Sequence, residues 1–305
     1  MRALYYAALA SAAGLSCVAC ERTPPPPPSY NGTWIARRLF PNSTQTQNAF
    51  CLSGSPPLYY VSPGWGDGAN KWQIHHEGGA WCGSAEDCLG WWGYRSTLVD
   101  PDTMAPDAMA STGYFNRSEP KNAMASWNFV FLRYCDGFSF ASDRSAPSIV
   151  PVNETYNATL WFRGLAILES IRDDLLTRGM GSATDVVVGG CSAGGMATFI
   201  HCDEWANAVA KVNTTTKVVC LADSGWFPLV PSTGYFPSTW FNGVWSGAFE
   251  WHNATAAVSA DCLADHAAAG TGWQCAMAEF AAPYISSALF MFQSVYDSFQ
   301  LFNVR

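Results

Sequence analysis

The sequence has few charged residues, and acidic residues outnumber basic ones. Charged residues make up 13% of the 305 positions, with 24 Asp and Glu against 16 Lys and Arg, which gives a net charge of −8. Proteins that bind nucleic acid rely on Lys and Arg to neutralise phosphates. The composition therefore argues against a nucleic-acid partner and leaves neutral or esterified substrates open.

The sequence also lacks a second long apolar run. Only its N-terminal stretch is apolar enough to be considered as a span, so no stable membrane insertion is expected elsewhere. Arg2 precedes this stretch and Ala19 offers a small-residue cleavage site, so residues 1–19 are expected to be a secretory signal peptide rather than an anchor. Residues 20–30 contain five consecutive prolines and are expected to form a stiff lead-in without a fold of its own.

Cysteines and glycosylation sequons agree with secretion to the extracellular space or cell wall. The 11 cysteines suit an oxidising compartment, where cysteines pair. Cys82 and Cys88 have a spacing found in zinc sites, but no second Cys or His pair stands at ligand spacing. A disulfide is therefore expected, and no metal or cofactor. Sequons of the type Asn-x-Ser/Thr mark candidate glycosylation sites; they lie at Asn31, Asn42, Asn116, Asn153, Asn157, Asn213 and Asn253.

The rest of the chain, residues 31–305, is expected to form one domain. It shows no internal repeat, and 49% of the sequence is hydrophobic, which is enough for a large core. Apolar runs typical of buried strands alternate with helical periodicity, which predicts an α/β fold with a mostly parallel sheet and helices on both faces. The predicted strands are 71–77, 128–134, 184–188, 217–221 and 288–294, and the predicted helices are 155–178 and 194–211.

The segment DVVVGGCSAGG places Ser192 between a predicted strand and a predicted helix. Gly190 and Gly194 complete the pattern G-x-S-x-G of the nucleophile elbow, where a serine occupies a sharp turn and glycines let the strand and helix approach closely. The alternative is a structural glycine turn with an incidental serine. The strand before it and the helix after it favour a nucleophile.

A nucleophilic serine also needs backbone amides that stabilise the negative charge developing on the substrate. We expect one amide from Ala193 at the helix start and others from Gly79 and Ala80, in the loop HHEGGAWC that follows a predicted strand. The alternative for this loop is a plain glycine turn. Among the 14 Trp, Trp81 and Trp226 are candidates to line a sugar or acyl pocket.

The candidate acid is Asp297, because it follows the last predicted strand in the order Ser then Asp that α/β-hydrolases use. Its rivals Asp136 and Asp223 are expected to hold loops through backbone amides. The general base is missing from its expected place, since no His follows Asp297. Each of the five histidines is expected to be structural rather than the base; they are His75, His76, His201, His252 and His266.

Together these segments resemble the pectin acetylesterase family, which includes the animal carboxylesterase Notum. The resemblance rests on HHEGGAWC, RYCDGFSFASD, GGCSAGGMATFIHCDEW, LADSGWF and QSVYDSFQ, which occur in the family's order. HCDEW and RYCDG are similar to the pectin acetylesterase branch. The resemblance implies an α/β-hydrolase fold with Ser192 as nucleophile, Asp297 as acid and an oxyanion hole at Gly79, Ala80 and Ala193. Ala80 stands where the family usually has a third Gly.

The resemblance also implies that the family's histidine lies some tens of residues beyond Asp297. The chain therefore looks truncated at its C-terminus, with the last part of its sheet missing. The expected function is that of a secreted serine esterase that removes O-acetyl groups from a polysaccharide. The alternatives are a Notum-like deacylase acting on a lipidated protein, and a catalytically inactive, secreted glycan-binding or interaction protein.

Overall fold

The computed structural model describes most of the chain after the proline run. The expected signal peptide, the lead-in and the two sequons at Asn31 and Asn42 lie outside the described residues. The described residues are 34–39, 48–96, 113–119, 121–229 and 238–303.

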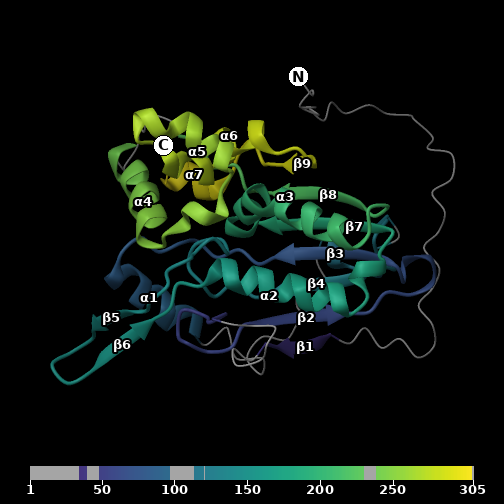
Figure 1. The fold of residues 1–305 in the computed structure, drawn as a ribbon, viewed down its shortest axis with the longest axis horizontal. Helices are drawn as coiled ribbons and strands as arrows, with labels where there is room; N and C mark the ends of the chain where they lie inside the picture. Colours follow the sequence, from purple (N-terminus) through teal and green to yellow (C-terminus); the bar gives the residue numbers. More distant parts are fainter. Residues whose placement is uncertain (1–33, 40–47, 97–112, 120, 230–237, 304–305) are drawn as a thin grey trace.

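One seven-stranded sheet organises the described chain, with the strand order β1-β2-β4-β3-β7-β8-β9 (Figure 1). The pairs β1–β2 and β2–β4 are antiparallel. The pairs β4–β3, β3–β7, β7–β8 and β8–β9 are all parallel. This mostly parallel sheet with its helices confirms the predicted α/β-hydrolase-like fold. The strands are β1 (Ile35–Arg38), β2 (Leu58–Ser62), β3 (Lys71–His76), β4 (Asn128–Leu132), β7 (Asp185–Cys191), β8 (Lys217–Asp223) and β9 (Ala288–Phe292).

Two long helices, α2 (Gly164–Thr177) and α3 (Ala193–Val212), pack on the face of the sheet that holds the larger core. Successive strand residues point to opposite faces, so Ile74 faces these helices while His75 faces the other side. On that other side, the short helical turn η3 (Gly113–Phe115) covers the ring of His75 through Phe115.

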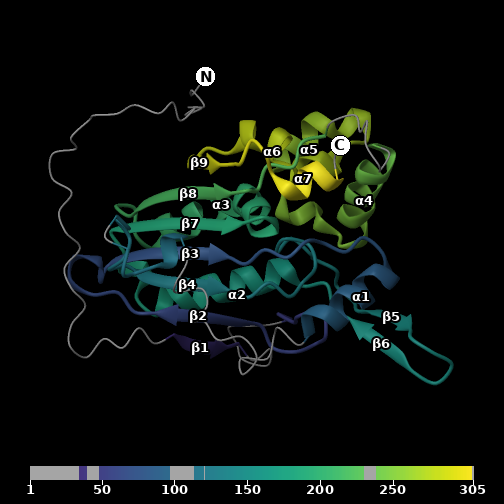
Figure 2. The ribbon, with the colours of Figure 1, turned by 180° about the vertical axis from the view of Figure 1, so that it is seen from behind.

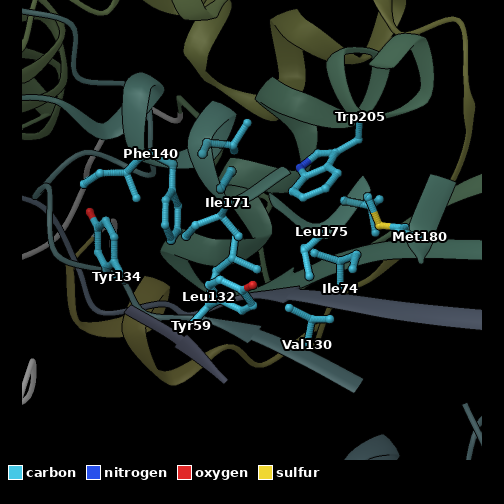
Figure 3. Close-up of a cluster of buried hydrophobic side chains, with 14 of the residues drawn as sticks. Tyr59, Ile74, Val130, Leu132, Tyr134, Phe140, Ile171, Leu175, Met180 and Trp205 are labelled. Carbon is cyan, nitrogen blue, oxygen red and sulfur yellow. The ribbon is translucent and has the colours of Figure 1, made fainter. Parts of the chain in front are cut away.

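The main core fills the space between the sheet and helices α2 and α3 (Figure 3). Ile171 and Leu175 of α2 and Trp205 of α3 have no exposed surface. They contact Ile74 of β3 and Val130 of β4 within this cluster. Burying each such apolar side chain stabilises the fold by about 1.5–3 kcal/mol, which fixes both helices, and the loops at their N-termini, against the strand ends.

A second layer of short helices gathers over the ends of the strands toward which β3 points (Figure 1). It has its own apolar cluster, with Trp245 and Phe249 of α4 against Met277. Because loops at the carboxyl ends of parallel strands carry the functional groups of such sheets, this layer lies on the side of the sheet where the candidate site is expected. The helices of this layer are α4 (Ser238–Trp251), α5 (Ala260–His266), α6 (Ala278–Ala281) and α7 (Ser298–Asn303), while α1 (Ala85–Ser96) lies beside strands β5 and β6.

The predicted helix 155–178 is wrong in its first part. Residues Asn157–Leu160 form strand β6, which pairs antiparallel with β5 (Ser148–Pro151) in a hairpin that projects from the body (Figure 2). Exposed and buried residues alternate along β6, which is the period of a strand. The helix begins only at Gly164, after the chain has left the hairpin.

The described sheet has β1 and β9 as its two outer strands, and Phe290 and Phe292 of β9 are 52% and 55% exposed. Within the described part of the chain, none of the helices combines the length and apolar character needed to span a membrane.

Candidate active site

The candidate site lies where three parallel strands end side by side. Cys191, the last residue of β7, pairs with Asp223 at the end of β8, and Asp223 pairs with Phe292 at the end of β9. The chain leaves these three strands at the same edge of the sheet. Ser192 follows Cys191 directly, and Asp297 lies in the segment after Phe292.

Ser192 occupies the sharp turn between β7 and α3. Its backbone has φ 60° and ψ −122°, a conformation that a non-glycine residue adopts only when its surroundings impose it. The amide of Ser192 donates to the carbonyl oxygen of Asp223 at 3.0 Å, which ties the turn to β8. Ser192 is half-buried, and its hydroxyl has no hydrogen-bond partner among the described residues. The serine thus has the geometry of a nucleophile elbow.

Close backbone contact at the turn requires glycine at two positions. A Cβ added to Gly194 would lie 2.0 Å from the carbonyl oxygen of His76. A Cβ added to Gly78 would lie 2.2 Å from the carbonyl oxygen of Cys191 and 3.1 Å from the Cβ of Ser192. The loop after β3 therefore lies directly against the turn that carries Ser192.

Backbone amides suited to an oxyanion hole flank Ser192. Ala193 is the first residue of α3, where backbone N–H groups have no partner within the helix. Ala80 has φ 60°, and its amide makes no hydrogen bond within the described chain. Gly79 has φ 152°. The loop expected to supply amides is thus beside the serine, with two consecutive residues at positive φ.

The two tryptophans expected in a pocket belong to different apolar clusters. Trp81 contacts the rings of Trp245 and Phe227 at centroid distances of 4.4 and 4.9 Å. Trp226 lies against Phe199 of α3, with the ring centroids 6.3 Å apart. Trp81 therefore joins the loop after β3 to the helical layer, while Trp226 joins the loop after β8 to α3.

Asp297 is held by neighbours that also hold the loop after β8. Its Oδ1 accepts from the backbone amide of Gln300 at 3.0 Å, and its Oδ2 accepts from Nε2 of Gln293 at 3.3 Å. The side chains of these two glutamines bind the backbone of Trp226: Gln293 Oε1 accepts from its amide, and Gln300 Nε2 donates to its carbonyl oxygen. Two side chains thus tie the segment of the candidate acid to the loop beside Cys191.

The thiol of Cys191 lies within the electrostatic influence of both Asp223 and Asp297. Burial is the largest cause that raises the pKa of Cys191, and the negative charges of Asp223 and Asp297 add to it, which brings the pKa to about 11. A thiol with that pKa stays protonated at neutral pH. Cys191 is the free cysteine among those described, and its chemistry makes it a poor nucleophile beside Ser192.

All five histidines bond to groups other than Ser192 and Asp297. The Nδ1 of His75 lies 3.1 Å from the hydroxyl of Tyr114. The remaining partners within the described residues are Trp205 for His76, Glu204 and Ser139 for His201, Ser142 and Cys82 for His252, and Thr271 for His266.

His252 belongs to a fully buried polar chain. Its Nδ1 lies 2.8 Å from Oγ of Ser142, whose hydroxyl also lies 2.6 Å from Oδ2 of Asp136. Its Nε2 lies 2.8 Å from the carbonyl oxygen of Cys82, so this nitrogen donates. Burial lowers the pKa of His252 to about 3. The imidazole is therefore neutral and structural, and it joins α4 to the loop after β3.

Asp136 organises the loop RYCDGFSFASD, as expected. Its carboxylate accepts from the amides of Phe140 and Phe138 at 3.0 and 3.3 Å. Burial raises its pKa despite these bonds and the bond from Ser142. Among the described residues, Asp223 does not bind backbone amides through its carboxylate in this way. Its side chain accepts from the hydroxyl of Ser224 at 2.8 Å, and its backbone carbonyl accepts from the amide of Ser192.

Sequence reasoning missed Ser139 and Tyr134, two buried residues of this loop that touch the candidate oxyanion loop. The hydroxyl of Tyr134 donates to the carbonyl oxygen of Ala80 at 2.9 Å, and Nε1 of Trp81 donates to Oγ of Ser139 at 2.7 Å. These partners are far apart in the sequence, and a Ser or Tyr in a loop gives no local signal of such a role.

Four disulfides brace the described chain. Cys82 and Cys88 are joined, which closes the loop after β3 just beyond Trp81. Two trios of Cys and His lie close together, one with His252 and one with His266. In each trio the two cysteines are disulfide-bonded, so their sulfurs are not available as thiolate ligands. The other three disulfides are Cys51–Cys135, Cys202–Cys220 and Cys262–Cys275.

An open groove of about 670 Å³ is lined in part by residues 83–86, which lie within the short loop closed by the Cys82–Cys88 disulfide. Arg144 lies over the ring of Trp251 on its wall, with the guanidinium carbon 4.9 Å from the ring centroid. The groove starts three residues after Ala80, so its near end lies within about 11 Å of the candidate hole. Its lining residues are Gly83, Ser84, Ala85, Glu86, Arg144, Gly247, Glu250 and Trp251.

The described sequons differ in surroundings. Asn153 and Asn157 are exposed on the β5–β6 hairpin. Asn253 is exposed, and its amide nitrogen donates to the carbonyl oxygen of Asp143 at 2.7 Å. Asn116 and Asn213 are half-buried. Glycosylation at these positions stays a prediction.

Comparisons with known proteins agree with the resemblance seen in the sequence. The family model described as Pectinacetylesterase matches residues 37–305. Pectin acetylesterase 11 of Arabidopsis thaliana is 29% identical over 86% of this chain and 62% of its own length. Pectin acetylesterase 5 of the same plant is 37% identical over 61% of this chain and 41% of its own length. Human palmitoleoyl-protein carboxylesterase NOTUM is 30% identical over 63% of this chain and 40% of its own length. The chain therefore covers less than two thirds of the length of pectin acetylesterase 11.

Proposed function

The chain belongs to the pectinacetylesterase family, and we propose that it is a serine carboxylesterase that removes O-acetyl groups from a polysaccharide. One observation carries this proposal: Ser192 sits at positive φ at the end of β7, with the glycine loop after β3 against it. That arrangement suits acyl transfer, because the attacking hydroxyl and the amides that receive the negative charge share one edge of the sheet.

The proposed reaction proceeds through an acyl-enzyme. Ser192 Oγ attacks the acetyl carbonyl carbon and gives its proton to a base, while the amides of Ala193, Gly79 and Ala80 donate to the developing oxyanion. Collapse of this intermediate breaks the ester bond, and the sugar oxygen leaves with the proton returned by the base. Water then attacks the acetyl-serine in the same manner, which releases acetate and restores the hydroxyl.

We propose that none of the five histidines of this sequence is the base. All five histidines of this sequence bond elsewhere in the fold. A serine hydroxyl without a base is a weak nucleophile at neutral pH. We assign Asp297 the role of orienting the histidine base, since it follows β9, whose last residue Phe292 pairs with Asp223, and Asp223 holds the amide of Ser192.

The proposed acyl group is small. Phe227 and Trp245, which contact Trp81 beside the candidate hole, are only 4% and 3% exposed. Packed rings of this kind fill space that a long acyl chain would need. The open groove that begins at Gly83 suits a polymer that extends past the reacting ester. Both features favour an acetylated polysaccharide over a lipidated protein.

We propose further that the protein is secreted, to the extracellular space or cell wall. Four disulfides within the described residues support an oxidising compartment. The exposed sequons at Asn153, Asn157 and Asn253 agree with it.

The test uses protein expressed from the complete coding sequence. Acetate release from acetylated pectin is compared with release of a long-chain acid from a palmitoylated peptide, for wild type and for Ser192→Ala. We expect acetate release that Ser192→Ala reduces by at least about a thousandfold. Preference for the palmitoylated peptide would establish the lipid deacylase instead. Binding of pectin without Ser192-dependent hydrolysis would establish a glycan-binding protein.

A further inference from the structure

We propose that Ser139 is a positioning residue that holds the two sides of the oxyanion hole in register. The inference rests on the proposed function, because it assigns a role to Ser139 in the same reaction. Ser139 lies in the loop after β4, and its side chain is fully buried. Its hydrogen-bond partners within the described residues are Trp81, Tyr134, Ala193 and His201, so its assigned role is to act through the segments that carry Ala80 and Ala193.

The hydroxyl of Ser139 bridges the two segments directly. It accepts a hydrogen bond from Nε1 of Trp81 at 2.7 Å and donates one to the carbonyl oxygen of Ala193 at 2.7 Å. Trp81 follows Ala80 in the loop after β3, and Ala193 begins α3. One hydroxyl group therefore links the candidate amide donors on either side of Ser192.

The backbone of Ser139 adds a second link to the same loop. Its amide donates to the hydroxyl oxygen of Tyr134 at 3.0 Å, and that hydroxyl donates to the carbonyl oxygen of Ala80 at 2.9 Å. The orientation of the Ala80 carbonyl is thus fixed through Tyr134, while the neighbouring indole is fixed through the Ser139 side chain.

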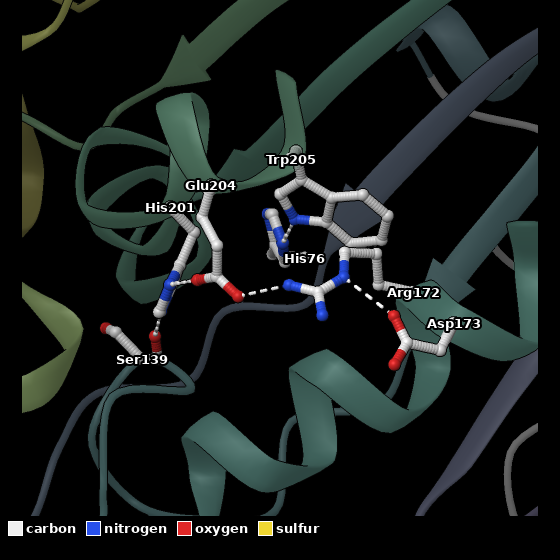
Figure 4. Close-up of polar contacts among 7 residues, drawn as sticks. All are labelled: His76, Ser139, Arg172, Asp173, His201, Glu204 and Trp205. Carbon is white, nitrogen blue, oxygen red and sulfur yellow. Dashed lines mark hydrogen bonds and ion pairs between the residues drawn. The ribbon is translucent and has the colours of Figure 1, made fainter. Parts of the chain in front are cut away.

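The carbonyl of Ser139 is anchored in turn to α3 and, through it, to α2 (Figure 4). It lies 3.3 Å from Nε2 of His201, whose Nδ1 lies 2.9 Å from a carboxylate oxygen of Glu204. The other oxygen of Glu204 accepts from Arg172 of α2 at 2.6 Å. Three polar groups of Ser139 are therefore used, and together they join its loop to the loop after β3 and to α3.

A simpler role for Ser139 is that of a turn residue. Ser139 and Phe140 have φ of 50° and 60°, a conformation that glycine adopts at less cost than serine. The two roles make opposite predictions for Ser139→Gly. Glycine keeps or eases the turn but removes the hydroxyl, so it separates the positioning role from the turn.

The experiment measures Ser139→Gly with protein expressed from the complete coding sequence and an aryl acetate substrate. We expect kcat to fall about tenfold to a hundredfold, since small displacements of catalytic groups cost that much. KM should stay within about twofold. Amide hydrogen exchange should become faster in peptides that contain Ala80 and Ala193. Asn48→Gly is the matched control, because Asn48 also has positive φ, at 68°, and is exposed.

A Ser139→Gly protein with wild-type kcat and wild-type exchange would overturn the inference. If Ser139→Gly does not fold, Trp81→Phe provides the test, because it removes the indole N–H that donates to Ser139 and keeps an aromatic ring. Unchanged exchange at Ala80 and Ala193 in Trp81→Phe would then contradict the proposal. If the wild-type protein showed no hydrolysis that depends on Ser192, only the proposed function would be refuted. Hydrogen exchange would still test whether Ser139 couples the segments of Ala80 and Ala193.

Discussion

Gly78 and Ser192 lie so close that a methyl group on Gly78 would stand 3.1 Å from the Cβ of Ser192. The same methyl group would stand 2.2 Å from the carbonyl oxygen of Cys191, a distance at which the backbone must shift. The glycine loop after β3 and the turn that carries the candidate nucleophile are therefore built as one unit. Two segments far apart in the sequence meet through backbone atoms, with no room between them.

Gly78→Ala is predicted to damage the reaction more than the fold. The loop has to move away from Ser192, and a displacement of about 1 Å at a catalytic group costs on the order of a hundredfold in rate. The measurement is kcat/KM with an aryl acetate beside the thermal midpoint. Gly90→Ala is the control, because a Cβ there meets nothing within 4 Å in α1. Equal kcat/KM for Gly78→Ala and Gly90→Ala would contradict the account.

Removing the Cys82–Cys88 disulfide is predicted to lower the free energy of unfolding by about 2 kcal/mol, the loop-closure value for so short a loop. The double substitution Cys82→Ser and Cys88→Ser avoids an unpaired thiol. Chemical denaturation measures the loss, and the equivalent change at Cys262 and Cys275 provides a comparison distant from the glycine loop. Loss of activity is expected only for the first pair, which braces the segment after Trp81.

Acid is predicted to destabilise the fold through buried neutral histidines. Burial lowers the pKa of His75 to about 3, against about 6.5 in the unfolded chain. Between these values the unfolded state binds one more proton than the folded state, so stability rises with pH and is lost as pH falls below 6.5. The slope is about 1.4 kcal/mol per pH unit for each such histidine.

His75→Phe tests this directly, because the ring already stacks on Phe131 and lies edge-on to Phe115. Groups such as Asp136 titrate in both proteins and cancel in the comparison. Between pH 6.5 and pH 5 the variant should lose about 1.4 kcal/mol per pH unit less stability than wild type. Parallel curves of unfolding free energy against pH would show that His75 does not titrate as stated.

Much of the fold could be predicted from the sequence where the signal is local. The helical pattern after Ser192 predicted α3 nearly in full, and the β-branched run before it predicted β7 as far as Val188 but not its last three residues, because burial on one or both faces leaves a periodic pattern. The prediction failed at residues 155–163, where Asn157–Leu160 pairs with β5. Pairing with the neighbouring strand β5 in a hairpin decided that conformation, and the four residues of β6 are too few for their alternation to stand out from the helical pattern that follows.

In the candidate site, too, the residues that belong to local motifs could be predicted, and those that depend on long-range contacts could not. The elbow glycines, the loop at Gly79 and Ala80 and the disulfide cysteines follow from motifs whose chemistry is local. Ser139 contacts Ala193 across 54 positions and Trp81 across 58. His252 contacts Ser142 across 110. These contacts depend on how loops from different strands meet at the sheet edge, which the sequence pattern does not encode.

The most direct test of the central claim is to trap the acyl-enzyme. Protein expressed from the complete coding sequence is mixed with an aryl acetate, quenched in acid and digested, and the masses of the peptides are measured by mass spectrometry. The account predicts one added acetyl group on the peptide that contains Ser192, and none in Ser192→Ala. An acetyl group on another residue, or full turnover by Ser192→Ala, would contradict the assignment of Ser192 as the nucleophile.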